Sequence, residues 1–148
     1  MLKLTLPPPV VFCIAGLSMF ALVGYDINAD EFQFWFAGSC WFVAIVNAIF
    51  ALRAFKKNRT TANPHHLERV TTLVTTGVFA YSRNPMYLSL VIMLIGWAVL
   101  LGSIWATGII FLFLLYMTQF QIKPEERMLI QKFDSEYQLY CSNVRRWL

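Results

Sequence analysis

The sequence predicts an all-α, polytopic membrane protein with four transmembrane helices and a cytoplasmic amphipathic C-terminal helix. Of the 148 residues, 58% are hydrophobic and 14% are charged, whereas a typical soluble domain carries about 25% charged residues. The charged residues are also missing from three long stretches, 4–25, 32–52 and 84–122. This composition excludes a disordered chain, a collagen-like chain and a disulfide scaffold, and it indicates a single membrane domain.

The four spans are expected at 10–25, 34–52, 86–101 and 104–121. A transmembrane helix needs about 20 residues, so the third charge-free stretch is long enough for two helices, with a turn at Gly102 and Ser103. The single domain then comprises a transmembrane hairpin (1–52), a cytoplasmic loop (53–85), a second transmembrane hairpin (86–122) and a cytoplasmic C-terminal helix (123–148).

The basic residues predict the orientation of the chain in the membrane. All twelve Lys and Arg fall in 1–9, 53–85 or 122–148, which lie on one side of the predicted bundle. The opposite loops carry three acidic residues and no basic residue. Because Lys and Arg accumulate on the cytoplasmic side, both termini are expected in the cytoplasm. This distribution accounts for the net charge of +4 without a nucleic-acid partner.

The cysteines and histidines predict no metal site. The three cysteines, Cys13, Cys40 and Cys141, are scattered along the chain and fit neither a disulfide framework nor a zinc site. His65 and His66 are adjacent and have no cysteine or carboxylate at ligand spacing. Such a pair is more typical of a solvated loop.

The cytoplasmic loop ends in a stretch that fits an anion site at the membrane surface. Gly77 allows a tight turn. Asn84 is a favourable N-cap and Pro85 a favourable first helical residue, so the third span should begin here, with its positive end beside Arg83. Such a helix end suits a carboxylate or a phosphate. In the structural alternative, Asn84 and Pro85 only cap the helix, while Arg83 and Tyr87 only anchor it at the lipid headgroups.

The C-terminal segment is predicted to be one helix. Pro124 suits a first turn, and Glu125 and Glu126 follow where acidic residues are favoured. Apolar and aromatic residues then recur at helical spacing. They are Leu129, Phe133, Tyr137, Tyr140, Val144 and Trp147. This face is consistent with a helix lying on the inner leaflet and equally with a flap over a site at the membrane surface.

Three motifs in this order resemble one family. They are Leu-Val-Thr-Thr-Gly-Val-Phe (73–79), Tyr-Ser-Arg-Asn-Pro-Met-Tyr (81–87) and Glu125-Glu126, followed by Phe133, Tyr137, Tyr140 and Val144-Arg145-Arg146. The set resembles the integral-membrane methyltransferases that include isoprenylcysteine carboxyl methyltransferase and the phospholipid N-methyltransferases. The resemblance covers residues 60–148, and the first hairpin contributes only hydropathy.

The resemblance implies a methyltransferase that binds S-adenosylmethionine in a cytoplasmic pocket capped by the C-terminal segment. Thr76, Gly77, Val78 and Phe79 match the turn that cradles the cofactor. Arg83, Asn84 and Tyr87 match the motif that holds the amino-acid end of the cofactor. Glu125 and Glu126 match the acidic pair near the reacting group. The resemblance therefore implies Arg83, Glu125 and Glu126 as catalytic residues, with Glu125 also contacting the cofactor. In the alternative, the glutamates only cap a helix.

Two departures from the family pattern bear on the acceptor. The family's histidine before the proline is Asn84 here, and the arginine of the isoprenylcysteine enzymes falls on Gln121. A carboxylate acceptor needs a cation to position it, whereas an amine acceptor must first lose a proton. Glu125 or Glu126 is a candidate base if burial raises its pKa. Both kinds of acceptor stay open.

The acceptor is expected to be amphiphilic or lipid-like and to enter from the inner leaflet between the third and fourth spans. Asn63 and His65 are further candidates for contacting the cofactor. Two alternatives belong to other classes of protein. A small exporter needs an ionisable group inside the bundle, which the predicted spans lack. A non-enzymatic membrane subunit leaves the convergence of the polar motifs unexplained. The oligomeric state stays open.

Overall fold

The computed structural model describes residues 6–23, 29–58 and 71–148, and no β-strand occurs among them. The helices are α1 (Pro8–Val23), α2 (Glu31–Lys57), α3 (Pro85–Leu100), α4 (Ile104–Tyr116) and α5 (Lys123–Asn143). A short 3₁₀ turn, η2 (Gly77–Ala80), precedes α3, and a π-helical segment, η3 (Met117–Ile122), joins α4 to α5. The all-α prediction is confirmed.

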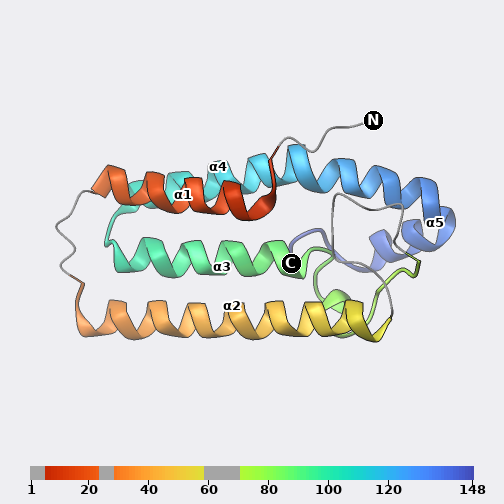
Figure 1. Cartoon of the computed structure of the whole chain (residues 1–148), viewed down its shortest axis with the longest axis horizontal. Helices are drawn as coiled ribbons and strands as arrows, with labels where there is room; N and C mark the ends of the chain where they lie inside the picture. Colours follow the sequence, from red (N-terminus) through yellow and green to blue (C-terminus); the bar gives the residue numbers. More distant parts are fainter. Residues whose placement is uncertain (1–5, 24–28, 59–70) are drawn as a thin grey trace.

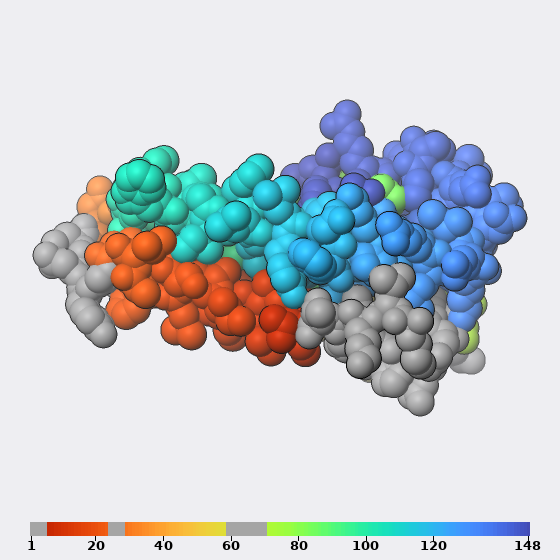
Figure 2. Space-filling view, turned by 90° about the horizontal axis from the view of Figure 1, so that it is seen from above, coloured from red at the N-terminus to blue at the C-terminus, as the bar shows by residue number. Residues whose placement is uncertain are grey.

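The helices α1 to α4 run along the long axis of the molecule, with α3 between α2 and the other two (Figure 1). Figure 2 shows α1 and α4 side by side along one face. The predicted turn after α3 is confirmed, since Gly102 has a φ of 61° that glycine adopts at little cost. The end of α2, the start of α3 and α5 lie together at the opposite end (Figure 1).

Two helices are long and apolar enough to cross a membrane, namely α2 and the continuous helix from Ile104 to Asn143. The apolar helices α1 and α3 are shorter. The four expected helices are therefore present, while the count of four membrane spans stays a prediction.

Charges are sorted to the two ends of the bundle. Arg53, Lys56 and Lys57 lie in the last turns of α2, at the end that also holds α5 (Figure 1). Asp30 caps the opposite end of α2. Its carboxylate accepts from the Gln33 N–H at 2.7 Å, and the Gln33 side chain accepts from the Asp30 N–H at 2.9 Å. This reciprocal pair is a capping box. We refer to the end with α5 as the charged end.

Small residues let α2 and α3 approach each other closely. The fully buried residues of α2 are Ala37, Ala44 and Ala51, which recur every seven residues and so lie on one face of the helix. On α3, a Cβ added to Gly96 would lie 2.9 Å from Trp41 Nε1 and 3.1 Å from the carbonyl oxygen of Ala37. Close packing of this kind holds helices together where lipid surrounds them.

Polar side chains of α2 also bind the backbone of α3. The Trp41 indole N–H donates to the Met93 carbonyl at 3.2 Å. The Asn47 amide donates to the Pro85 carbonyl at 2.7 Å and to Ser89 Oγ at 2.9 Å. The Asn47 contacts fix the start of α3 against the middle of α2, and the Trp41 contact ties the middle of α3 to α2.

The predicted single C-terminal helix is wrong in two respects. Asp134, with a φ of 40°, interrupts α5, and the chain turns back there (Figure 1). The helix also ends at Asn143, so Val144 and Trp147 do not belong to it. The predicted face is therefore divided, because its members lie before the kink, after it, or beyond the helix.

The α2–α3 contact yields a prediction for stability. Gly96→Ala should lower the free energy of unfolding by about 1–3 kcal/mol, because the added methyl group meets the rigid indole of Trp41 and the Ala37 backbone. The measurement is reversible unfolding in detergent micelles. Gly38→Ala is the matched control, because its Cβ meets nothing within 4 Å and alanine favours a helix by about 1 kcal/mol. Equal effects of the two substitutions would contradict close packing at Gly96.

Candidate functional site

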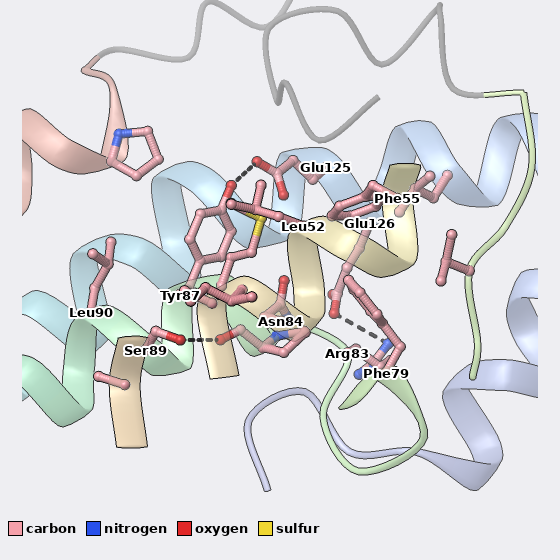
Figure 3. A pocket seen from close by; sticks show the side chains of 18 of the residues that line it. Leu52, Phe55, Phe79, Arg83, Asn84, Tyr87, Ser89, Leu90, Glu125 and Glu126 are labelled. Atoms are coloured by element: carbon pink, nitrogen blue, oxygen red, sulfur yellow. Dashed lines mark hydrogen bonds and ion pairs between the residues drawn. The ribbon is translucent and has the colours of Figure 1, made fainter. Parts of the chain in front are cut away.

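A cavity of about 470 Å³ lies at the charged end of the bundle, within the range of about 300–1,000 Å³ typical of small-molecule sites. Its walls come from the start of α1, the second half of α2, the segment before α3, the first half of α3, and α5. Figure 3 shows two polar pairs in the lining, Glu125 with Tyr87 and Glu126 with Arg83, and we refer to the part of the lining that carries them as the polar wall. The rest of the lining is mostly apolar.

The apolar part of the cavity extends between α2 and α3. Leu52 and Ala48 of α2 face it, as do Leu90 and Met93 of α3, and the start of α1 contributes Pro8. None of the described lining residues comes from α4. The predicted entry of the acceptor between the third and fourth spans therefore receives no support. The apolar part of the cavity, which we call its apolar limb, lies along α2 and α3 instead.

Glu125 is held at one edge of the polar wall. The Tyr87 hydroxyl donates to Glu125 Oε1 at 2.6 Å, and the Gln121 amide donates to the same oxygen at 2.5 Å. Neither bond uses Oε2. Gln121 belongs to the π-helical segment η3, which ends at Ile122, and Glu125 lies in the first turn of α5, which follows without a break. Both side chains therefore reach Tyr87 from one continuous helix. Segments of π-helix occur frequently at functional sites.

Burial raises the pKa of the Glu125 carboxyl from its usual value of 4.5 to about 7. The hydrogen bonds from Tyr87 and Gln121 favour the charged form and oppose this shift, while the charge of Glu126 adds to it. A carboxyl group with a pKa close to the working pH can both accept and release a proton. Glu125 is therefore suited to general-base chemistry.

Glu126 lies between two arginines. Arg146 donates from Nε at 3.0 Å and from Nη2 at 2.8 Å, one bond to each carboxylate oxygen. Arg83 Nη1 lies 3.2 Å from Glu126 Oε1, and Figure 3 shows the Arg83 and Glu126 side chains pointing toward each other. The charge of Glu126 is thus shared by two guanidinium groups, which suits it to holding neighbours rather than to proton transfer.

Asn84 occupies the predicted N-cap position of α3, but its side chain does not cap the helix. Its amide instead donates to the carbonyl of Arg146 at 2.9 Å. The Arg83 backbone N–H donates to the carbonyl of Arg145 at 3.0 Å. The prediction of a side-chain cap is wrong because residues far along the chain supply a carbonyl acceptor at this position.

The predicted turn at Gly77 is confirmed, with a φ of 67°. Of the four residues of this turn that are expected at the cofactor, Phe79 lines the cavity, whereas Thr76, Gly77 and Val78 are not among its described lining residues. The Phe79 carbonyl accepts a hydrogen bond from the Tyr140 hydroxyl at 2.6 Å. The Phe79 ring lies edge-on to Phe55 of α2 at 5.0 Å. The turn is therefore tied to α5 and to α2.

The structure brings together six of the predicted site residues on one cavity wall: Phe79, Arg83, Asn84, Tyr87, Glu125 and Glu126. Sequence reasoning assigned no role to Asn47 or to Arg146. The signal for Asn47 was a lone polar amide within an apolar span, and the signal for Arg146 was a basic pair near the end of the predicted C-terminal helix. Asn63, His65 and His66 lie outside the described residues. Among the described residues, no group of three or more His, Cys, Asp or Glu is placed to hold a metal ion.

The apolar helices and the cavity at their charged end are those of a helical membrane protein with a partly polar pocket at one end. The sequence model of the phospholipid methyltransferase family matches residues 32–136. The chain belongs to this family, which confirms the predicted resemblance to membrane methyltransferases. An uncharacterized protein of Haemophilus influenzae is 46% identical over 63 residues, which are 43% of this chain and 100% of that protein. No solved structure matches the chain.

The bond between Tyr140 and η2 yields a prediction. Tyr140→Phe should lower the free energy of unfolding by about 1–3 kcal/mol, because it leaves the Phe79 carbonyl without its donor in a buried place. Unfolding in detergent micelles measures the change. Tyr81→Phe is the control, since Tyr81 is 79% exposed. If both variants match the native protein, this bond contributes nothing to stability.

The burial of Glu125 yields a second prediction. Its pKa is about 7 when folded, so the folded state binds a proton more tightly than the unfolded state does. The free energy of unfolding contributed by Glu125 should therefore fall as the pH rises from 4.5 to 7. Glu125→Gln should remove this component, seen as a smaller pH slope in micelle unfolding. Glu136→Gln, at an exposed carboxylate, should leave the slope unchanged. An identical slope in native protein and Glu125→Gln would disprove the assignment.

Proposed function

We propose that the chain is an S-adenosylmethionine-dependent methyltransferase that acts on an amphiphilic or lipid-like acceptor at the cytoplasmic face of a membrane. The observation that carries this proposal is the cavity at the charged end. Motifs separated by tens of residues in the sequence line its polar wall, and its apolar limb continues between α2 and α3. A ligand with a polar reacting group and an apolar tail fits both parts.

The donor groups of the polar wall suit the cofactor. Arg83 Nε is buried and has no hydrogen-bond partner among the described residues, so the Arg83 guanidinium has bonding capacity left for a carboxylate. Glu126 would balance an ammonium group, and Phe55 and Phe79 offer aromatic surface for a purine base. When bound, S-adenosylmethionine supplies an electrophilic methyl group on a positively charged sulfur.

The chain's own residues would align the reactants and move one proton. Arg83 and Glu126 hold each other across the polar wall, so their positions are set before a ligand binds. Such alignment is the main contribution available to an enzyme in an in-line transfer. Glu125 would accept the proton that an acceptor must lose. Tyr87, which donates to Glu125, holds that carboxylate in place.

The charges favour an amine acceptor over a carboxylate. Arg83 lines the cavity, contacts Glu126 and is assigned to the carboxylate of the cofactor. Arg146 is not among the described lining residues, and the position of the family's further arginine is occupied by Gln121, which bonds Glu125. An amine would instead meet Glu125, whose pKa of about 7 suits deprotonation of a cation. A phospholipid amine is therefore favoured as the acceptor over an isoprenylcysteine carboxylate.

The same proposal places the protein in the membrane. Four helices would span the bilayer, with α1 and α3 reaching the interfaces through their flanking residues. The charged end, which carries Arg53, Lys56 and Lys57, would face the cytoplasm because basic residues accumulate there. Residues 1–9 and 123–148 would then lie on the cytoplasmic side.

Transfer of label from the cofactor tests the activity. Purified protein in vesicles should move a labelled methyl group from S-adenosylmethionine to phosphatidylethanolamine faster than to an S-farnesyl cysteine carboxylate. Glu125→Gln should lower turnover by roughly 10²–10⁴-fold, the usual contribution of a general base, and retain cofactor binding. Glu136→Gln, at an exposed carboxylate, should retain full turnover. Label found only in water-soluble products would overturn the lipid acceptor.

Calorimetry separates this proposal from a non-enzymatic subunit or an exporter. S-adenosylmethionine should bind the protein in detergent, and Arg83→Gln should weaken that binding. Absence of binding at millimolar cofactor would favour the non-enzymatic alternatives.

A further inference from the structure

The segment 144–148 returns from α5 to the start of α3, beside the polar wall (Figure 1). Two of its carbonyl groups accept from the motif that begins α3, since Arg145 accepts from the Arg83 N–H at 3.0 Å and Arg146 from the Asn84 amide at 2.9 Å. Its Trp147 indole donates to Thr118 Oγ1 of η3 at 3.2 Å. The segment is thus bound on two sides, to the start of α3 and to η3.

The Arg146 side chain bonds the polar wall as well. It donates a hydrogen bond to each carboxylate oxygen of Glu126. The Arg146 side chain is 34% exposed, whereas the side chains of Glu126 and Arg83 are 13% and 11% exposed. Arg146 therefore lies on the outer side of the ion cluster, and Arg83 lies on the inner side. Arg146 does not line the cavity among its described lining residues.

We propose that Arg146 is a positioning residue of the methyl-transfer site, which holds Glu126 and, through it, Arg83 in the cavity wall. This inference rests on the proposed function. The two-pronged contact fixes the plane of the Glu126 carboxylate, which a single contact cannot do. With that plane fixed, Glu126 Oε1 faces Arg83 Nη1. Arg83 also contacts Cys141 Sγ, but a thiol is a weak acceptor and cannot replace a carboxylate.

The backbone contacts make the effect specific to this position. The Arg146 carbonyl is the acceptor for Asn84, so a loosened Arg146 also releases the residue that precedes α3. A single substitution of Arg146 therefore disturbs both Glu126 and Asn84, which belong to motifs far apart in the sequence. A general loss of helix packing would not follow, because Arg146 lies beyond the end of α5 at Asn143.

The kinetic test compares three variants in vesicles. Arg146→Gln should lower kcat/KM by roughly 10- to 100-fold, because misplacement by about 1 Å can cost about 100-fold. It should also raise KM for S-adenosylmethionine through the looser Arg83. Arg146→Lys keeps the charge and loses the fork, so it should recover part of the activity. Arg127→Gln removes a charge from the exposed residue next to Glu126 and should match the native protein.

Hydrogen exchange provides a readout that needs no turnover. In Arg146→Gln, the backbone N–H of Arg83 should exchange faster because its acceptor segment detaches, while exchange in the middle of α2 and α3 stays native. Unchanged exchange at Arg83, or faster exchange with native kcat and KM, would overturn the positioning role. Faster exchange throughout the bundle would also overturn it, since the residue would then be structural.

The two proposals fail in distinguishable ways. If the native protein binds no S-adenosylmethionine and transfers no methyl group, the proposed function fails. If the native protein is active and Arg146→Gln retains its kcat and KM, the positioning role alone fails. If Arg146→Lys is as active as the native protein, the two-pronged contact is dispensable and the role assigned to it is wrong.

Discussion

Close approach of α2 to α3 is the constraint on which the rest of the molecule depends. Side chains as small as Ala37 and Ala44 on one helix, and Gly96 on the other, bring the backbones together. Only at this separation does the Asn47 amide reach the Pro85 carbonyl at 2.7 Å. That bond fixes where α3 begins, and the beginning of α3 places Tyr87 on the cavity wall. The apolar bundle thus sets the geometry of the polar site.

The polar wall combines two carboxylates with opposite environments. Glu126 is balanced by two guanidinium groups, and Glu125 is held by the neutral donors Tyr87 and Gln121. In a poorly solvated place this difference matters, because a charge that lacks a counter-ion is costly. Adjacent residues of the same type therefore have different surroundings, since Glu126 is paired with two arginines and Glu125 with none.

Much of the fold followed from where charged residues are absent, because an apolar stretch of span length in a membrane protein has few options besides a helix. The cavity residues from Phe79 to Tyr87 and the glutamate pair were also predictable, because their motifs are contiguous. The reversal at Asp134 was not, since a positive φ at a non-glycine residue leaves no periodic signal. The contact of Asn84 with Arg146 was equally unpredictable from the sequence, because only the tertiary fold brings residues so distant in sequence together.

The manner in which the site is assembled has a consequence for heat inactivation. The helices are held by extensive side-chain packing, whereas the segment 144–148 is held largely by hydrogen bonds, such as those from the Arg83 N–H to Arg145 and from Trp147 to Thr118. Segments with few buried contacts open at a lower free energy than the bundle they rest on. On warming, the wall of the cavity should therefore come apart while the helices are still intact, and ligand binding should vanish from a protein that is still almost fully helical.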